Sequence, residues 1–545
     1  MRSKTLRIIP LGGLGEVGKN MTVYEYGEDI LVVDAGLMFP DNDMIGIDYI
    51  IPDFEYLKGK ARHVRGIIIT HGHEDHTGAI GHVLEEMNVP IYATPLTRGL
   101  IEGKLVRRGF TKKADMRTIH AGDSIQIGPF KVDIFHVCHS IPDGVGLGIE
   151  TPAGLVVHSG DYKFDHTPVD NWPTDYAKLA EFSQRGVLAL LADSTNAERP
   201  GWTPSERVID PALDKVFQEA KGRIIVATFA SLISRMQQVV NTATRYGRKV
   251  AFVGMSMTGN VKIAQKLGYL DFEDNSIVSV ENALNMKAEK VVLMVTGSQG
   301  EPSSVLGRLA MGTNRRFDIK AGDTVVLSSH PIPGNEEMVY RVVNKLIQQG
   351  ADVIYEAVAP VHVSGHASQE EIKLLLHLVK PKYLVPIHGE LRMLKQHAKL
   401  AIEVGIPEKN IALVENGQVI EFTNGKMSLG KRIPGGYVFV DGTGVGDVDR
   451  SVVREREVLG KDGILLINLE IYKNSSKLKE TEIITRGFML SDDSDDLLNN
   501  LREKIKRTVA RSGGNLQKDV QNVVKSYIYN ETKRRPVVFV TLSRT

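Results

Sequence analysis

Short apolar runs that end in small or polar residues dominate the first two hundred residues of the chain. The runs at 22–26 and 29–34 are rich in β-branched and aromatic residues, and only Gly27 and Glu28 separate them. This spacing predicts a β-hairpin with a two-residue turn. Similar runs recur along 1–202, so we expect a β-rich domain with occasional helices there.

The pattern changes at 203–355 to a regular alternation of apolar strands and amphipathic helices. Such alternation predicts a parallel sheet, whose ligand-binding groups gather where the strands end. Shorter strand and helix pieces return at 356–425. A glycine-rich stretch makes 426–455 a predicted linker, and the pattern of 456–545 predicts a small terminal α/β domain.

Composition adds a class and a local charge to this picture. The 545 residues are 42% hydrophobic and 24% charged, which is typical of a globular protein with several domains. The net charge is only +1, but residues 497–545 contain eleven Lys or Arg against three Asp or Glu. This segregated charge indicates either a solvated helical face or a surface for a polyanion.

The only cysteine, Cys138, excludes an intramolecular disulfide and a zinc site built from cysteines. It adjoins His139, and neighbours on a strand face opposite ways, so we expect a buried thiol. No apolar stretch reaches the roughly 18 to 20 residues that a membrane span needs, and the first residues do not resemble a signal peptide. The expectation is a soluble, cytoplasmic protein with no membrane partner.

Four side chains of the kind that bind metals lie within six residues, directly after an apolar strand. They are His71, His73, Asp75 and His76 in the sequence HGHEDH. Residues two apart on such a loop point the same way, so His71 and His73 can bind one ion while the other two turn toward a neighbouring ion. One loop can therefore contribute to two adjacent metal sites.

Further candidate ligands follow other apolar strands. His139, Asp161 and His388 each come between an apolar strand and a turn. A histidine in such a place is often a core or surface residue, but the three together complete the ligand count for two ions. The carboxylate of Asp161 can bridge two ions, which a single ring nitrogen cannot do.

A glycine motif near the start offers a different reading. Gly13, Gly15 and Gly18 follow an apolar run, and Asp34 ends a later one, as in the fingerprint of dinucleotide-binding proteins. That fingerprint requires a helix directly after the glycines. Here the predicted hairpin follows instead, so we expect a close backbone approach to the metal site, with Asp34 supporting that site.

The sequence HGHEDH is the signature of hydrolases with the metallo-β-lactamase fold, an αβ/βα sandwich with two zinc ions at its rim. By this resemblance His71, His73 and His139 hold one zinc ion, Asp75, His76 and His388 hold the other, and Asp161 bridges them. The segments around Asp193, His362 and His366 resemble the β-CASP nucleases. Together with GIDYIIPDF, HSIPDG, TGSQGEP and PIPGNE, they make the whole chain similar to the bacterial ribonuclease J family.

The resemblance implies a β-CASP domain at 203–355, inserted into a metallo-β-lactamase domain, and hydrolysis of single-stranded RNA in RNA maturation and decay. Two divalent ions activate water for in-line attack on phosphorus; zinc is implied, with manganese or magnesium as alternatives. The expected action is that of a 5′-to-3′ exonuclease that favours 5′-monophosphate ends, and of an endonuclease. Asp75, His76, His366 and Asp193 are the expected catalytic residues, with His366 as proton donor and Asp193 supporting the site.

Substrate contacts are expected from the loop His362, Val363, Ser364, Gly365 and His366, and from Ser231, Ser298 and Ser329 at strand ends. The resemblance also implies a structural calcium ion at Ile45, Ile47 and Asp441. The chain departs from the family at Met255, where an arginine is expected.

We further expect residues from about 450 onward to mediate self-association into a homodimer or homotetramer, with other RNA-decay proteins as partners. Three other functions stay open from the sequence: a DNA-directed β-CASP nuclease, a hydrolase of small esters or lactams, and an inactive RNA-binding scaffold.

Overall fold

The structure is a computed structural model that describes residues 5–110, 114–332, 334–473, 477–488, 495–512 and 514–545. The chain divides into two compact units. The first unit comprises Met1–Phe39 and Ile50–Val438, and the second comprises Pro40–Tyr49 and Phe439–Thr545. Within the described residues, no helix combines the length and the apolar character needed to cross a membrane.

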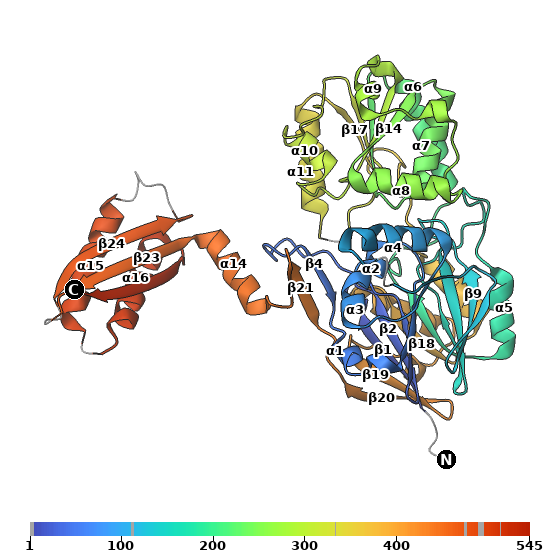
Figure 1. The fold of residues 1–545 in the computed structure, drawn as a ribbon, viewed down its shortest axis with the longest axis horizontal. Coiled ribbons are helices and arrows are strands. Elements are labelled where there is room, and N and C mark those ends of the chain that lie inside the picture. Colours follow the sequence, from blue (N-terminus) through green and yellow to red (C-terminus); the bar gives the residue numbers. More distant parts are fainter. Residues whose placement is uncertain (1–4, 111–113, 333, 474–476, 489–494, 513) are drawn as a thin grey trace. The chain divides into compact units, whose positions relative to one another are not determined.

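Two β-sheets form the core of the first unit (Figure 1). The eight-stranded sheet has the order β20 (Lys426–Arg432), β19 (Gln418–Thr423), β1 (Leu6–Gly12), β2 (Met21–Tyr26), β3 (Asp29–Val33), β5 (Val64–Ile68), β6 (Ile91–Ala93), β7 (Met116–Thr118). The six-stranded sheet has the order β18 (Tyr383–Ile387), β12 (Val187–Asp193), β11 (Gly154–His158), β10 (Val145–Thr151), β9 (Phe130–His136), β8 (Ser124–Ile127). The predicted hairpin is confirmed, because β2 and β3 pair antiparallel with Tyr26 opposite Asp29.

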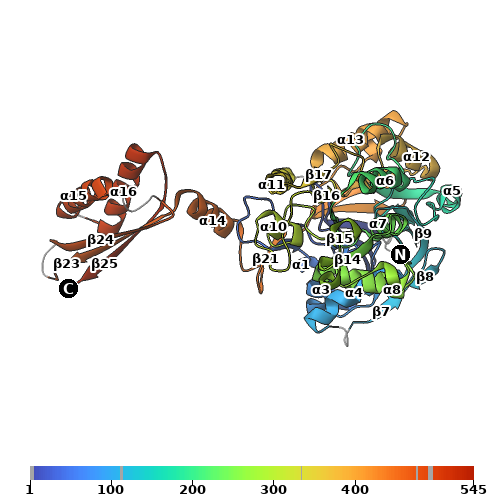
Figure 2. The ribbon, with the colours of Figure 1, turned by 90° about the horizontal axis from the view of Figure 1, so that it is seen from above.

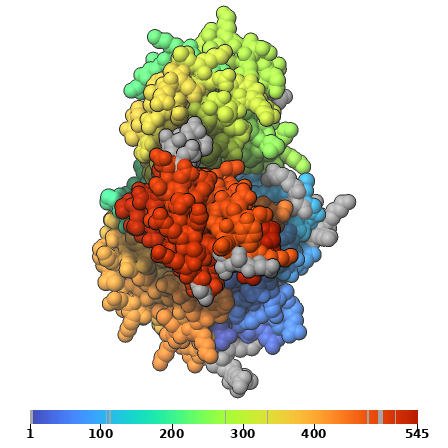
Figure 3. Space-filling model, turned by 90° about the vertical axis from the view of Figure 1, so that its left-hand side faces the viewer, coloured from blue at the N-terminus to red at the C-terminus, as the bar shows by residue number. Residues whose placement is uncertain are grey.

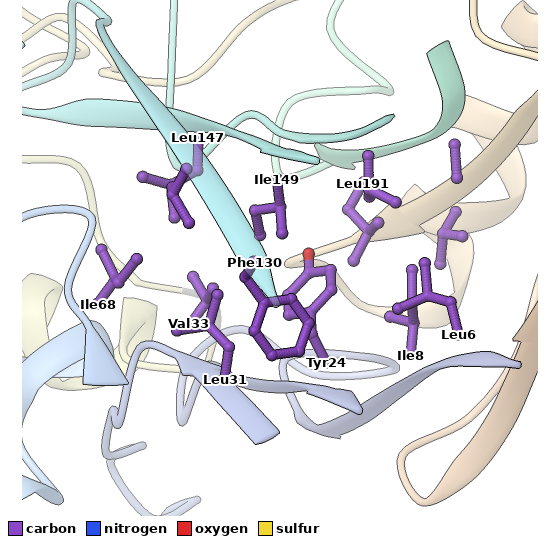
Figure 4. Packing of buried hydrophobic residues seen from close by; sticks show 14 of the residues in the cluster. Leu6, Ile8, Tyr24, Leu31, Val33, Ile68, Phe130, Leu147, Ile149 and Leu191 are labelled. Atoms are coloured by element: carbon purple, nitrogen blue, oxygen red, sulfur yellow. The ribbon is translucent and has the colours of Figure 1, made fainter. Parts of the chain in front are cut away.

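Apolar side chains from both sheets fill the space between them (Figure 4). Tyr24 and Val33 of the eight-stranded sheet share this core with Phe130 and Ile149 of the six-stranded sheet, and all four are buried. Helices cover the outer faces, as sheets that are apolar on both sides require. The result is the expected αβ/βα sandwich, with helices α3 (Ile80–Glu86), α4 (Pro95–Arg108), α5 (Tyr176–Arg185), α12 (Gln369–Val379) and α13 (Leu391–Glu403).

A parallel sheet is inserted between β12 and β18, as the alternating pattern predicted. Its order is β14 (Lys249–Val253), β15 (Val291–Val295), β13 (Ile224–Ala227), β16 (Thr324–Leu327), β17 (Asp352–Ile354). One face packs on α6 (Ile209–Glu219), α7 (Ile233–Arg245) and α8 (Met255–Lys266); the other packs on α9 (Val280–Leu284), α10 (Val305–Ala310) and α11 (Glu336–Gln348). Figure 2 shows α6, α7, α8, α10 and α11 around the sheet, and α9 is labelled in Figure 1.

The second unit contains a small three-stranded sheet within Phe439–Thr545, the part drawn in dark orange to red in Figure 3. Its order is β24 (Leu478–Arg486), β23 (Ile464–Ile471), β25 (Val537–Arg544). Alternate residues of β23, such as Leu465 and Ile467, are buried with apolar residues of α15 (Asp495–Arg511) and α16 (Leu516–Thr532). This is the small α/β arrangement expected at the end of the chain.

The stretch predicted as a linker, 426–455, contains regular structure. It holds β20, β21 (Tyr437–Asp441), β22 (Gly444–Val445) and the start of α14 (Arg450–Asp462). Strand β20 pairs antiparallel with β19. The glycine-rich composition predicted a connector. Hydrogen bonds to β19 instead make residues 426–432 the edge strand of the eight-stranded sheet.

Candidate metal centre

The loop after β5 and the short helix α2 (Glu74–Thr77) bring four candidate ligands together. Nε2 of His71 lies 3.0 Å from Nδ1 of His73. Asp75 and His76 belong to the first turn of α2, so their side chains leave the loop in another direction. One segment of the chain therefore contributes to two groups of candidate ligands.

Three imidazoles form the first donor group, which consists of His71, His73 and His139. Nε2 of His139 lies 3.2 Å from Nδ1 of His73. Asp161 completes the group, since its Oδ2 is 3.7 Å from Nε2 of His71 and 3.8 Å from Nε2 of His139. Burial lowers the pKa of His71 and His139 well below the ordinary value and that of His73 to about 4, which keeps these rings neutral and able to bind a cation.

The second donor group consists of Asp75, His76, Asp161 and His388. Nε2 of His76 lies 3.2 Å from Oδ2 of Asp161 and 3.5 Å from Oδ2 of Asp75. Nε2 of His388 lies 3.3 Å from Oδ2 of Asp75, and its Nδ1 lies 3.0 Å from Oδ1 of Asp161. Asp161 therefore belongs to both groups.

Both groups fit a divalent ion. Ligand atoms about 2.0 to 2.1 Å from a tetrahedral zinc ion are about 3.3 Å from one another, and the donor atoms here are 3.0 to 3.8 Å apart. The buried Nε2 of His388 forms no hydrogen bond with any described residue. An unpaired buried nitrogen of this kind is costly unless a ligand binds it, and the donor set of imidazoles and carboxylates suits a divalent metal.

Contacts behind the ligands fix their orientation. Nδ1 of His76 donates to Oδ2 of Asp34 at 2.8 Å, and Asp34 also accepts a hydrogen bond from the backbone of Thr70. Nδ1 of His139 donates to the carbonyl of Gly365 at 2.8 Å. Each bond leaves Nε2 with a lone pair that faces the donor group, an arrangement common around metal ions.

The loop from His362 to His366 reaches the same centre. Nδ1 of His366 donates to Oδ2 of Asp193 at 2.7 Å, and the His366 side chain is 19% exposed. Burial lowers the pKa of His366, but the carboxylate of Asp193 outweighs burial and raises it above the ordinary value. Asp161, Asp193, His366 and His388 form a third cluster that overlaps the second group.

Two residues that sequence reasoning missed hold this loop. Asn196 donates to Oγ of Ser364 at 2.8 Å and to the carbonyl of His366 at 3.0 Å. Arg235 is fully buried and donates to the carbonyl of Val361 and to Glu206. An arginine in an amphipathic helix suggests a solvated position, and only the three-dimensional arrangement places it beneath the loop. His362 itself is largely buried, and burial lowers its pKa well below the ordinary value.

The serines expected to line a groove differ in exposure. Ser298 and Ser329 are buried, and Oγ of Ser329 donates to the carbonyl of Ser298 at 3.2 Å. Ser231 is partly exposed in the loop between β13 and α7. Ser231 is therefore more accessible to a ligand than the other two.

The structure also describes three other features expected from the sequence: the possible calcium residues, Met255 and Cys138. In the second unit, Arg456 donates to Oδ2 of Asp441 at 2.6 Å and to the carbonyl of Ile45 at 3.4 Å. An arginine therefore already pairs with two of the three residues expected to bind calcium, the third being Ile47.

Met255 begins α8 and is 91% exposed. Cys138 is buried with its pKa raised to about 11 by burial, as expected for an inert thiol.

Comparison with known protein families gave four matches. The metallo-beta-lactamase superfamily matches residues 14–195, and the Ribonuclease J beta-CASP domain matches residues 221–346. The Zn-dependent metallo-hydrolase RNA specificity domain matches residues 350–412. The Ribonuclease J C-terminal domain matches residues 451–545.

Full-length relatives are similar along the whole chain. Ribonuclease J2 of Bacillus subtilis is 41% identical over 544 residues, which cover 98% of each chain. Ribonuclease J of Thermus thermophilus is 41% identical over 550 residues, covering 98% of this chain and 94% of the relative. A solved structure, a protein of unknown function from Enterococcus faecalis, is 16% identical with a TM-score of 0.54, and it covers 76% of this chain and 100% of its own; this likeness concerns the fold alone.

Proposed function

Since the chain belongs to the ribonuclease J family and is a metal-dependent ribonuclease of the metallo-β-lactamase fold, we propose that it cleaves RNA with two zinc ions. We propose further that it acts both as a 5′-to-3′ exonuclease that favours 5′-monophosphate ends and as an endonuclease, in RNA maturation and decay. The observation that carries the proposal is the pair of donor groups, with the Asp161 carboxylate within 3.8 Å of ligand atoms of both.

Two divalent ions side by side would activate a water and stabilise the attacking and leaving oxygens during displacement at phosphorus. His71, His73 and His139 would hold one ion, and Asp75, His76 and His388 the other, with Asp161 between them. The buried carboxylate of Asp161 supports this role, because the nearby His388 and His76 hold its pKa well below the ordinary value even though burial opposes ionisation. Asp34 keeps the His76 ring in one orientation through its hydrogen bond to Nδ1.

His366 is the proposed proton donor to the leaving 3′ oxygen of the ribose. Its Nδ1 is bound by Asp193, so the proton on Nε2 is the one it can give. The raised pKa of His366 keeps the ring protonated at neutral pH, and its partial exposure lets a substrate reach it. Asp193 acts through His366 as a positioning residue.

A positive environment near His362 supports binding of an RNA phosphate. Burial comes first in lowering the pKa of His362, and the cations Arg235, His330 and Arg199 lower it further. The same field would attract a phosphate group. We propose that the RNA backbone is contacted by the loop residues His362, Val363, Ser364, Gly365 and His366, together with Ser231 and Ser298.

The experiment that tests this function combines metal analysis with cleavage assays on matched substrates. Purified protein should contain two divalent ions per chain, with zinc expected and manganese or magnesium measured in parallel. It should degrade 5′-monophosphate RNA faster than 5′-triphosphate RNA and leave single-stranded DNA of the same sequence intact. Equal cleavage of the DNA would favour a DNA-directed nuclease instead.

We also propose self-association through the second unit. Helices α15 and α16 cover one face of its sheet, while Leu466, Ile484 and Phe539 lie in one row on the other face, with Phe539 51% exposed. Truncation at residue 450 should lower the native mass in light scattering. We also propose that the protein works in the cytoplasm, with other RNA-decay proteins as partners. Its single cysteine suits a reducing compartment.

A further inference from the structure

The glycine-rich loop at 12–20 contacts the segment that carries His388. The backbone N–H of Gly15 donates to the carbonyl of Gly389 at 2.9 Å, and the N–H of Gly389 donates to the carbonyl of Gly13 at 3.2 Å. Gly389 directly follows His388, whose backbone φ is +50°, a conformation that is uncommon for residues other than glycine. The two hydrogen bonds therefore hold the backbone of a metal ligand in an unusual conformation.

The end of the same loop contacts the segment that carries Asp75 and His76. The N–H of Asn20 donates to the carbonyl of Asp75 at 2.9 Å, and the side-chain amide of Asn20 donates to the same carbonyl at 3.2 Å. The amide nitrogen also lies 3.1 Å from Nε2 of His76. Among the described residues, the loop makes no hydrogen bond to His71, His73 or His139. Its contacts with the ligands belong to the second donor group alone.

The loop coils tightly enough to require glycine. A Cβ on Gly12 would lie 1.8 Å from the carbonyl oxygen of Lys19, and a Cβ on Gly13 would lie 2.2 Å from Oδ1 of Asn20. Gly13 also has a φ of +85°. The start and the end of the loop are therefore in direct contact, so a displacement at one end reaches the other.

A buried ion pair fastens the middle of the loop. Lys19 is fully buried, and its Nζ lies 2.7 Å from Oε1 of Glu16. The same oxygen accepts hydrogen bonds from the N–H of Gly13 at 3.1 Å and from Nδ2 of Asn416 at 2.8 Å. Oδ1 of Asn416 accepts from the N–H of Leu14 at 3.2 Å. Burying two charges costs about as much free energy as their attraction returns, so stability alone does not explain the pair.

We propose that the Lys19–Glu16 ion pair is a positioning device for the second metal ion. It locks the glycine loop as a brace between α2 and the segment after β18, and so sets the spacing of Asp75 and His76 relative to His388. The inference rests on the two-ion function proposed above. Lys19 and Glu16 act through the ligands and touch neither ion nor substrate.

The test measures how tightly each of the two ions binds, using cobalt(II) titration of the metal-free full-length protein followed by visible absorption. The wild-type protein should bind two ions. Lys19→Met and Glu16→Gln should each keep one tightly bound ion and weaken the other about 10- to 100-fold, as loss of supporting contacts does at other metal sites. A general loss of structure would weaken both ions together.

A matched control is the buried ion pair of Arg223 and Asp323 at the amino-terminal ends of β13 and β16 in the parallel sheet, with N–O distances of 2.9 and 2.5 Å. Arg223→Met should lower the melting temperature and leave both ions bound. If Lys19→Met does not fold, Asn416→Ala tests the same brace without leaving a lone buried charge. Two equally tight ions in the brace variants, or equal weakening of both, would overturn the inference. Fewer than two ions in the wild-type protein would instead overturn the proposed two-ion function.

Discussion

The two donor groups that share Asp161 are built in different ways. The first group takes His71 and His73 from one loop, and its imidazoles have a lowered pKa because burial dominates. The second group takes Asp75 and His76 from α2 and His388 from a distant part of the chain, as the first group takes His139. Burial lowers the pKa of His76 and His388 as well, but carboxylates led by Asp161 outweigh it and raise the pKa well above the ordinary value.

The two donor groups also depend on different supporting contacts. The first group needs a local loop and the carbonyl of Gly365, whereas the second needs the buried Asp34 and the brace at 12–20. Damage to the loop at 12–20 should therefore weaken the second ion before the first, whereas loss of the contact between His139 and Gly365 should weaken the first ion.

The largest effect is expected from removing the second group while the first stays intact. Asp75→Ala combined with His76→Ala deletes two donors, so RNA cleavage should fall by more than about a thousandfold, since one ion cannot stabilise both oxygens. Metal analysis should show one ion instead of two. His120→Ala, at an exposed histidine, is the control and should leave both values unchanged. Undiminished cleavage in the double variant would refute the mechanism.

Local patterns predicted much of this arrangement. The hairpin and the parallel sheet follow from apolar periodicity, and HGHEDH indicated a metal site because four ligands stood in six residues. The supports of the site depend on contacts between distant segments, such as Asn20 with Asp75 and Arg235 with Val361. Short-range patterns carry no information on these pairs. The strand β20 was missed for a different reason. It pairs with β19 across the two-residue turn Asn424-Gly425, a local hairpin signal that the prediction of a linker at 426–455 did not take into account.

The next largest effect on cleavage is expected from removing the proposed proton donor, His366. His366→Ala should lower the cleavage rate about a hundred- to ten-thousandfold, the usual contribution of a general acid, while both ions stay bound. In the wild-type protein the protonated ring is the active form, so activity should fall as pH rises through the raised pKa of His366. Asp193→Asn removes the charge that raises this pKa and should move the alkaline limb to lower pH. An unchanged limb in that variant would contradict the assigned role.

Two substitutions at residues that support the ligands should affect the two donor groups separately. Asp34→Asn replaces the carboxylate that accepts from Nδ1 of His76 and should weaken the second ion about 10- to 100-fold. Gly365→Ala places a Cβ 2.7 Å from Nδ1 of His139 and should weaken the first ion instead. Cobalt(II) titration of both variants measures the two affinities. The same ion weakened in both variants would mean that the groups are not independent.

The smallest effect lies outside both groups. Met255 is 91% exposed at the start of α8, where the family resemblance leads us to expect an arginine. Met255→Arg adds one exposed positive charge, which contributes up to about 1 kcal/mol and so lowers KM for RNA up to about fivefold. Both ions and kcat should stay unchanged, because the charge meets the substrate backbone and not the reacting atoms. The gain should shrink as salt concentration rises, as exposed phosphate contacts do. A change in kcat or in metal content would show that α8 communicates with the donor groups.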